Sequence, residues 1–404
     1  MKTFECVEGG VTAAAGFRAC GVAAGIKYQH RRDVAMVVAD RPAAVAAVYT
    51  TNKAAAAPVQ LDRERTRSGK AQAVVVNSGC ANACTGDTGL ANARETARLA
   101  AEALGIDEQL VLVCSTGVIG VNLPMDRMAE GVRLAAGALS ATGGDDAAHA
   151  IMTTDTVDKQ IAVELEIDGQ PVKIGGMCKG AGMIEPNMAT MLGFITTDAA
   201  VDPLALDEAL HAVTDKSFNR VIIDGDMSTN DTVILMANGA AGNKTLTMRH
   251  PQWQDFVDAL TMVCVELAKK LVMDGEGATK FVTVRVKGAL TVADAQKAAR
   301  AIAKSPLAKT SWFGLDPNWG RVIAAVGYSG AAVDDRWAQI YYGDVCAYDK
   351  GRVADKAMLK PMQDVMRKRA FDITVNLNLG NGEDTVYTCD FSYDYVKINA
   401  EYTT

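Results

Sequence analysis

The residues best suited to chemistry lie in the segment 179–198, which reads KGAGMIEPNMATMLGFITTD. Glycines let its backbone approach a ligand or another strand closely, and Pro186 then stiffens the chain. Thr190 follows the small Ala189 and precedes the apolar run Met191–Thr197, which has strand character. A threonine in this position suits an N-terminal nucleophile, because the small neighbour leaves room at the preceding carbonyl and β-branching limits the side-chain rotamers. The structural alternative is that Thr190 is only a residue at the start of a buried strand.

Cleavage of the chain before Thr190 would give this threonine its own general base. Attack of the Thr190 hydroxyl on the Ala189 carbonyl moves the acyl group from nitrogen to oxygen, and water then splits the ester. The new α-amino group has an unperturbed pKa of about 7.7 to 8.0, so it can accept the hydroxyl proton near neutral pH. No histidine is required, and the four in the chain stand apart from recognised nucleophile motifs: His30, His149, His211 and His250.

Metal and nucleotide sites have little support in the sequence. Cys80 and Cys84 could share a helix face, but no histidine or second cysteine pair accompanies them to complete a zinc site. The loop 224–226, with Asn230 and Asp231 after it, resembles a cation-binding loop but lacks the alternation and closing glutamate of a calcium site. No Walker-type phosphate loop occurs. We therefore expect no metal and no bound cofactor.

Composition narrows the class of protein. The 404 residues are 49% hydrophobic but only 6% aromatic, and the net charge is −7. Because the basic residues are scattered, nucleic acid is a poor partner. Glu5 and Glu8 interrupt the start before an apolar stretch reaches signal-peptide length, and no run reaches the ~18 apolar residues of a membrane span. Nine cysteines without paired spacing suggest reduced thiols, so we expect a soluble cytoplasmic enzyme.

Short β-branched runs and amphipathic stretches are mixed along the chain. The runs that indicate strands are Val34–Val38, Ala73–Val76, Leu110–Val113, Ile161–Ile167, Arg220–Ile223, Phe281–Val286, Val322–Val326 and Ile373–Leu377. The stretches that indicate helices are Leu90–Leu104, Met125–Ala138, Leu204–Val213, Trp253–Val272, Val292–Ala303 and Asp355–Arg369. This order predicts an α/β or α+β layered fold, with helices packed on mixed sheets. A boundary is expected near Lys280, which leaves a smaller α+β C-terminal part at 281–404.

Two smaller motifs are interpreted structurally. Asp87 and Thr88 are expected to cap the first of these helices, and Thr291 the fifth. The sequence DPNWGR, at Asp316–Arg321, is expected to form a turn before a strand, with Trp319 packed and Arg321 paired.

Motifs along the whole chain resemble one enzyme family. The segment KGAGMIEPNMATMLGF is similar to the processing motif of the ornithine acetyltransferases, also called glutamate N-acetyltransferases. The resemblance extends to GVTAAAGFRACGVAAGIK near the start, to VNSGCANACTG, CSTGVIG, DGDMSTNDT and DPNWGR, and to the ending YVKINAEYTT. It implies an N-terminal-nucleophile-like fold, shared with self-processing aminopeptidases.

The resemblance also implies an activity. Cleavage between Ala189 and Thr190 would give an α chain, 1–189, and a β chain, 190–404, which stay associated as a heterotetramer with two copies of each. The free Thr190 would take acetyl from N-acetylornithine, release ornithine and pass the acetyl group to glutamate in a ping-pong cycle of arginine biosynthesis. Some members of the family also accept acetyl-CoA as a donor.

Site residues follow from the same resemblance. It places the oxyanion hole at Thr116 and Gly117, although spacing alone makes this an ordinary turn after a strand. The implied substrate contacts are Thr153, Lys179, Thr190, Glu276, Asn399 and Thr404. Lys179 could pair with the α-carboxylate that both substrates carry, and Glu276 with a cationic amine. The residues near the C-terminus require a tail that folds back over the pocket.

Two other functions stay open at this level. The same nucleophile with water as acceptor is a self-processing aminopeptidase or amidase, and the chemistry of Thr190 alone does not separate hydrolysis from transfer. A non-catalytic amino-acid sensor with this fold would instead remain one intact chain.

Overall fold

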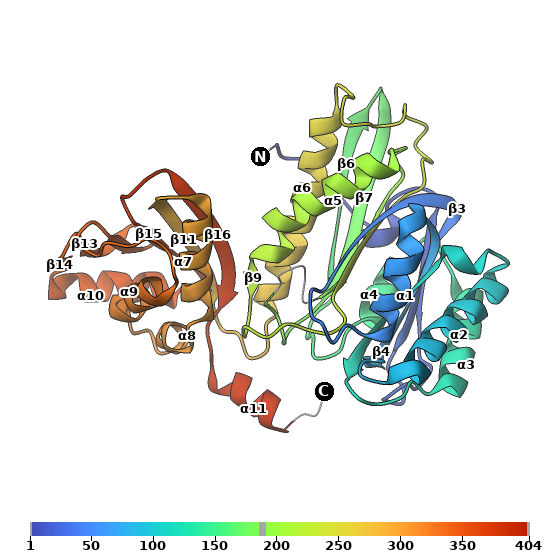
Figure 1. Ribbon diagram of the computed structural model, residues 1–404, viewed down its shortest axis with the longest axis horizontal. Helices are drawn as coiled ribbons and strands as arrows, with labels where there is room; N and C mark the ends of the chain where they lie inside the picture. The colour runs from blue at the N-terminus through green and yellow to red at the C-terminus, as the bar shows by residue number, and fades with distance from the viewer. Residues whose placement is uncertain (1, 186–190, 402–404) are drawn as a thin grey trace.

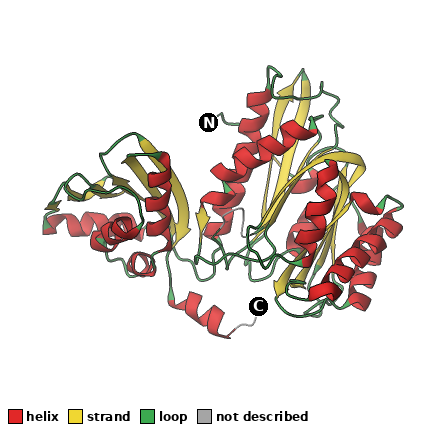
Figure 2. Ribbon diagram, in the orientation of Figure 1, coloured by secondary structure: helices red, strands yellow, loops and turns green. Residues whose placement is uncertain are grey.

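The computed structural model describes residues 2–185 and 191–401, and these fold around two mixed β-sheets (Figures 1 and 2). Along the first sheet the strands follow the order β1-β6-β7-β8-β10-β3-β4-β5, with β2 paired to β3. In that order the strands are β1 (Glu5–Val7), β6 (Lys159–Ile167), β7 (Gln170–Lys179), β8 (Leu192–Thr197), β10 (Thr232–Ala237), β3 (Val34–Tyr49), β4 (Lys70–Cys80) and β5 (Val111–Val118), with β2 at Phe17–Val22. The second sheet follows the order β14-β13-β12-β15-β11-β16-β9. Its strands are β14 (Arg352–Val353), β13 (Val345–Asp349), β12 (Gln339–Tyr342), β15 (Ala370–Asn376), β11 (Phe281–Ala289), β16 (Gly382–Cys389) and β9 (Val221–Ile222).

Helices cover both sheets, except for the last helix of the chain, which leaves the second sheet (Figure 1). They are α1 (Ala57–Arg65), α2 (Gly86–Leu104), α3 (Met125–Ala138), α4 (Gly144–Ala150), α5 (Pro203–Lys216), α6 (Trp253–Met273), α7 (Val292–Lys304), α8 (Pro306–Phe313), α9 (Trp319–Tyr328), α10 (Leu359–Arg367) and α11 (Tyr393–Glu401). Helix α6 packs on β6 and β7, and α7 packs on β11 and β16. Within residues 2–185 and 191–401, no helix has the length and apolar content that crossing a membrane requires.

Strand β3 is buried on both of its faces. Val34, Met36 and Val38 lie in the core that β3 and β4 share with α2 and α3. Ala35 and Val37 lie in a separate core, which includes the alanines of α4. Because side chains alternate along a strand, the apolar run at the start of β3, Val34–Ala39, supplies both cores at once.

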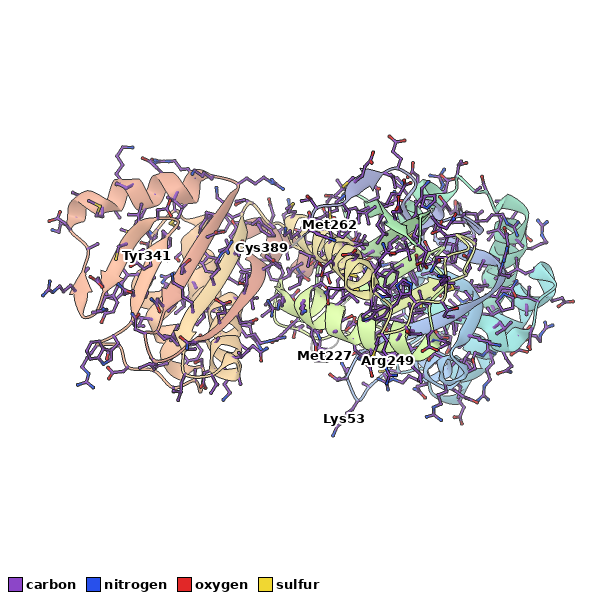
Figure 3. The ribbon with its side chains drawn as sticks, turned by 90° about the horizontal axis from the view of Figure 1, so that it is seen from above. Lys53, Met227, Arg249, Met262, Tyr341 and Cys389 are labelled. Carbon is purple, nitrogen blue, oxygen red and sulfur yellow. The ribbon has the colours of Figure 1, made fainter. Side chains whose placement is uncertain are left out.

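The two sheets are linked by the path of the chain. β9 belongs to the second sheet, yet the chain returns from it to the first sheet to form β10. At the end of β16, Cys389 packs into the core beneath α5 and α6, and Figure 3 labels it at the junction between the two sheets. The second sheet has its own core, in which Trp312 and Tyr342 are fully buried.

Helix α11 leaves the second sheet and extends below the space between the two sheets (Figure 1). None of its residues is buried. Its first turn is fixed to the second sheet's layer by aromatic contacts. Phe391 stacks on Tyr395 with 4.6 Å between ring centroids, and Tyr393 meets Phe313 of α8 edge-on at 5.4 Å.

The mixed α/β architecture expected from the sequence is confirmed, and α3 has the predicted bounds. The prediction of a strand at Val322–Val326 was wrong, because these residues belong to α9. Asn318 caps this helix by accepting a hydrogen bond from the Arg321 amide. A short apolar run does not distinguish a strand from a buried helix segment, so periodicity alone could not decide it.

Two other local predictions need correction. The DPNWGR motif is not a turn before a strand, because its last three residues form the first turn of α9. Trp319 does pack, stacked on Tyr348, and Arg321 donates to the Leu307 carbonyl at 2.7 Å. Helix α2 begins at Gly86, so Asp87 and Thr88 lie inside its first turn. Thr291 caps α7 as predicted, by accepting from the Asp294 amide.

The packing of α6 predicts a large difference between two leucines. Leu260 is fully buried in the core beneath α5 and α6, so Leu260→Ala removes apolar contacts and leaves a cavity. We expect a loss of about 2–5 kcal/mol in the free energy of unfolding, measured by urea denaturation. Leu204→Ala, at a position 75% exposed on α5, is the matched control and should change it by less than about 0.5 kcal/mol. Equal losses in both variants would contradict this view of the core.

Candidate active site

One pocket brings together the described residues that the resemblance assigned to the site. Its lining includes Thr116, Gly117, Thr153, Lys179, Glu276 and Asn399. Met191, the residue after Thr190, also lines it. Ala189, Thr190 and Thr404 lie outside the described residues. Residues from both sides of the predicted cleavage point therefore form one pocket.

The end of β5 forms one wall of this pocket. Gly117 has φ 132°, and a Cβ there would stand 2.3 Å from the Gly79 carbonyl carbon on the neighbouring strand, so the position requires glycine. The Asn230 side chain holds this strand end in place by donating to the carbonyls of Ser115, at 2.8 Å, and Ala81, at 2.7 Å. These contacts give the Thr116–Gly117 backbone a fixed geometry at the pocket wall.

Lys179 ends β7 and reaches into the pocket. Its Nζ donates to the Thr153 hydroxyl at 2.7 Å and to the Thr116 hydroxyl at 3.4 Å, and it lies 3.8 Å from an Asp155 carboxylate oxygen. Burial lowers the pKa of Lys179, and the charge of Asp155 opposes that effect. The ammonium group therefore depends on a carboxylate that the sequence prediction did not include.

Glu276 follows α6 and is held by hydrogen bonds at its backbone and at its carboxylate. Its amide donates to the Ala181 carbonyl at 2.8 Å, and its carboxylate accepts from the Asn399 side chain at 2.8 Å. A Cβ on Gly182 would stand 2.5 Å from the Glu276 carboxylate. The absent side chain of Gly182 thus leaves space for an acidic group beside the pocket.

The segment before the predicted cleavage point is fixed by the loop 224–226, whose sequence resembles a cation-binding loop. The Asp224 carboxylate accepts from the amides of Met183, at 2.6 Å, and Ile184, at 2.8 Å. The Glu185 amide donates to the Asp226 carbonyl at 2.9 Å. Burial raises the pKa of Asp224, while the hydrogen bonds from backbone amides favour its ionised form. The Asp224 carboxylate and the Asp226 carbonyl thus hold the backbone of residues 183–185.

Several charged residues around the pocket were not predicted from the sequence. Lys27 and Arg31 line it, and Arg31 donates to the Thr153 carbonyl at 2.9 Å. Behind Lys179 lie Asp155, Lys159 and Asp274, which form a buried set of ion pairs. The sequence did contain one indication of this cluster. Side chains alternate along a strand, so Lys159 lies on the same face of β6 as the inward-facing residues Val163, Leu165 and Ile167. A lysine at an inward position indicates a buried charge that needs a partner.

Comparison with known proteins decides the family. A model of the ArgJ family matches residues 18–404. The chain belongs to the ArgJ family.

Curated relatives agree with this assignment. The chain is 54% identical over 404 residues to the arginine biosynthesis bifunctional protein ArgJ of Symbiobacterium thermophilum, covering 99% of this chain and 100% of the relative. It is 55% identical over 389 residues to the protein of the same name from Geobacter sulfurreducens, covering 96% and 99%. The solved ArgJ of Bacillus halodurans is 43% identical, with a TM-score of 0.50, and the match covers 52% of this chain and 98% of that one. The family and the enzyme class expected from the motifs, an arginine biosynthesis acetyltransferase of the ArgJ family, are therefore confirmed.

The close approach of Gly182 to Glu276 gives a test in this ArgJ family member. In Gly182→Ala, the new methyl group must displace the flexible carboxylate rather than backbone, so stability should change little. Displacing that carboxylate should lower acetyl transfer by about 10- to 100-fold, measured as kcat/KM. Gly137→Ala is the control, since a Cβ there meets nothing within 4 Å. Full transfer by Gly182→Ala would exclude a role for the placement of Glu276.

Proposed function

We propose that this chain transfers acetyl from N-acetylornithine to glutamate through an ester on Thr190. The observation that carries the proposal is the pocket, in which Thr116, Lys179 and Glu276 gather beside Met191, the residue that follows Thr190. Its walls supply hydroxyl and ammonium groups from one part of the chain and a carboxylate from another. Membership of the ArgJ family makes acetyl transfer in arginine biosynthesis the matching activity.

The first step is self-cleavage. The Thr190 oxygen bonds to the Ala189 carbonyl carbon, the Thr190 nitrogen leaves with the proton, and water hydrolyses the resulting ester. This step yields chains of 189 and 215 residues and a free α-amine beside the nucleophile. The solved relative from Bacillus halodurans supports such a division, because 98% of that chain is matched by about half of this one.

The second step is acetyl transfer. The α-amine of Thr190 takes the hydroxyl proton as the oxygen attacks the acetyl carbonyl, ornithine leaves, and the glutamate amine later takes the acetyl group from the ester. Both half-reactions pass through a tetrahedral oxyanion. Donors from Thr116 and Gly117 would stabilise it, and the loss of one such donor costs about 10²- to 10³-fold in other acyl-transfer enzymes.

Charge complementarity supports amino-acid substrates. The Lys179 ammonium lies at the pocket wall and suits an α-carboxylate, which N-acetylornithine and glutamate share. Glu276 suits the cationic side-chain amine of N-acetylornithine, and Asn399 fixes the direction of its carboxylate. Thr153 positions the Lys179 ammonium, and Thr404 is assigned to the substrate site by family resemblance alone.

Further parts of the proposal extend the family comparison. The chemistry requires no metal or bound cofactor. The relatives are named bifunctional, which supports N-acetylglutamate synthesis from acetyl-CoA as a second activity. We also assign the enzyme to the cytoplasm, as a heterotetramer with two copies of each fragment.

The covalent step gives a direct prediction. After incubation with N-acetylornithine, intact-mass analysis should show two fragments, with one acetyl group added to the fragment that begins at Thr190. Thr190→Ala should remain a single chain and acquire no acetyl group. A preparation with full turnover that consists only of intact chain would refute the mechanism, and an intact, inactive native protein would favour the sensor.

Added glutamate separates the transferase from the hydrolase in the same assay. Ornithine release should accelerate with glutamate, and N-acetylglutamate should form in equal amount. Release at a rate independent of glutamate would favour the aminopeptidase or amidase.

The tail supplies a separate prediction. Deletion of residues 399–404 removes the Asn399 hydrogen bond to Glu276 and should lower acetyl transfer at least about 10-fold. Processing should continue, because residues 181–185 keep their backbone contacts with Glu276 and the 223–226 loop. Lys397→Ala, at an exposed position on the same helix, is the control. Normal transfer after truncation would exclude the tail from the substrate site.

A further inference from the structure

Three charged side chains lie buried behind the pocket wall that carries Lys179. The Lys159 ammonium donates to the Asp155 carboxylate at 2.7 Å and also to the carboxylate of Asp274. The Lys159 side chain is 1% exposed, and those of Asp155 and Asp274 are 0% and 5% exposed. Such groups lose their hydration on burial, and breaking one pair leaves an uncompensated charge.

Asp155 joins this cluster to the pocket. Its carboxylate accepts from the Gly180 amide at 2.7 Å and from the Thr153 amide at 3.0 Å. It also lies 3.8 Å from the Lys179 ammonium. Gly180 follows Lys179 in the chain, and Thr153 accepts a hydrogen bond from Lys179, so one carboxylate fixes the backbone on both sides of that ammonium group.

Lys159 joins the same carboxylate to the other half of the chain. Its second partner, Asp274, caps the end of α6 and also accepts from the Thr156 amide at 3.0 Å. Glu276 stands two residues beyond Asp274. The position of Lys179 is thereby tied to the segment that carries the acidic side of the pocket.

We propose that Asp155 and Lys159 are positioning residues for Lys179. Asp155 holds the Lys179 ammonium in place as its counter-charge. Lys159 pairs with the same carboxylate and thereby weakens the attraction between Asp155 and Lys179. The inference rests on the proposed function, in which the Lys179 ammonium binds the substrate carboxylate. Neither residue lines the pocket as the structure describes it, so both act through Lys179 and not on substrate.

The charges that face Lys179 come from several elements. Burial lowers its pKa; Asp155 raises that pKa, and Lys159 on β6 lowers it. Glu276, after α6, and Asp231, before β10, also raise the pKa of Lys179. Burial alone would raise the pKa of Asp155, but Lys179 and Lys159 hold it below its usual range. An ammonium group is lost as pH rises through its pKa, so substrate binding should fall on the alkaline side of the pH profile.

The two positioning residues therefore predict opposite effects. In Asp155→Asn, Lys179 loses the charge that raises its pKa most, so the alkaline limb of kcat/KM should move to lower pH by about 1 unit. In Lys159→Met, Lys179 loses a neighbouring cation, so the same limb should move to higher pH. Asp155 stays ionised in that variant, because Lys179 and two amides still favour its charged form. A role in stability alone would lower the melting temperature of both variants without moving the limbs apart.

The experiment measures kcat/KM for glutamate-dependent ornithine release between about pH 6 and about pH 11, a range that spans the usual pKa values of an α-amine and a lysine. Asp384→Asn is the control, because this buried carboxylate pairs with Arg220 at 2.8 Å in the second sheet. The alkaline limb of kcat/KM for Asp384→Asn should lie at the same pH as in the native enzyme. Opposite shifts in the two variants support the inference; shifts in one direction, or none, overturn it. If Asp155→Asn does not fold, Lys159→Met alone tests the inference: a shift of its alkaline limb to higher pH supports the inference, and a shift to lower pH or no shift overturns it.

Failure of the proposed function is distinguishable in the same assay. Native protein that transfers no acetyl from N-acetylornithine to glutamate refutes that function, and this inference with it. Native transfer with unmoved limbs refutes the positioning role alone.

Discussion

The site depends on how strands of the first sheet are ordered. β8 and β10, from beyond the predicted cleavage point, lie between β7 and β3, from before it. β8 pairs antiparallel with β7 from Lys179↔Leu192 onward, and β10 pairs antiparallel with β3. β8 and β10 also pair with each other, so a break between the two chains would leave this pair flanked on both sides by strands of the other fragment. Separation would expose those ladders and the cores they cover, which is why cleavage is compatible with a stable enzyme.

That pairing also fixes the direction of Lys179. Side chains alternate across a strand, so a slip of one residue in the β7–β8 register would turn Lys179 to the opposite face of the sheet. The Asp224 carboxylate holds Met183 and Ile184, and the Ile223 amide donates to the Ile184 carbonyl at 2.7 Å. The segment between Lys179 and Glu185 is thus determined by contacts at both ends, and this makes the geometry of the pocket reproducible.

The sequence predicted the parts of this arrangement that are local. β-branched runs located β4, β5, β6 and β15, and motif resemblance selected Thr116, Lys179 and Glu276, which the fold brings to one pocket. The sequence could not predict that Asp155 and Asp274, 119 positions apart, both form ion pairs with Lys159. Those contacts depend on how α6 packs against the first sheet. The failure at α9 has the opposite origin. At Val322–Val326 the local apolar pattern fits both a strand and a buried helix segment. The Asn318 cap and the surrounding core favour the helix.

The second sheet contributes to the pocket by holding the tail. Lys309 of α8 is fully buried, donates to the Thr388 hydroxyl at 2.7 Å and lies 4.6 Å from the centroid of the Phe391 ring. Asp390 accepts from the amides of Thr279, at 2.8 Å, and Lys280, at 2.9 Å, just beyond Glu276. The chain that leaves β16 is therefore attached to the chain that leaves Glu276. Because α11 starts from this shared point, two turns of helix suffice to bring the Asn399 side chain to the Glu276 carboxylate, although none of the residues of α11 is buried.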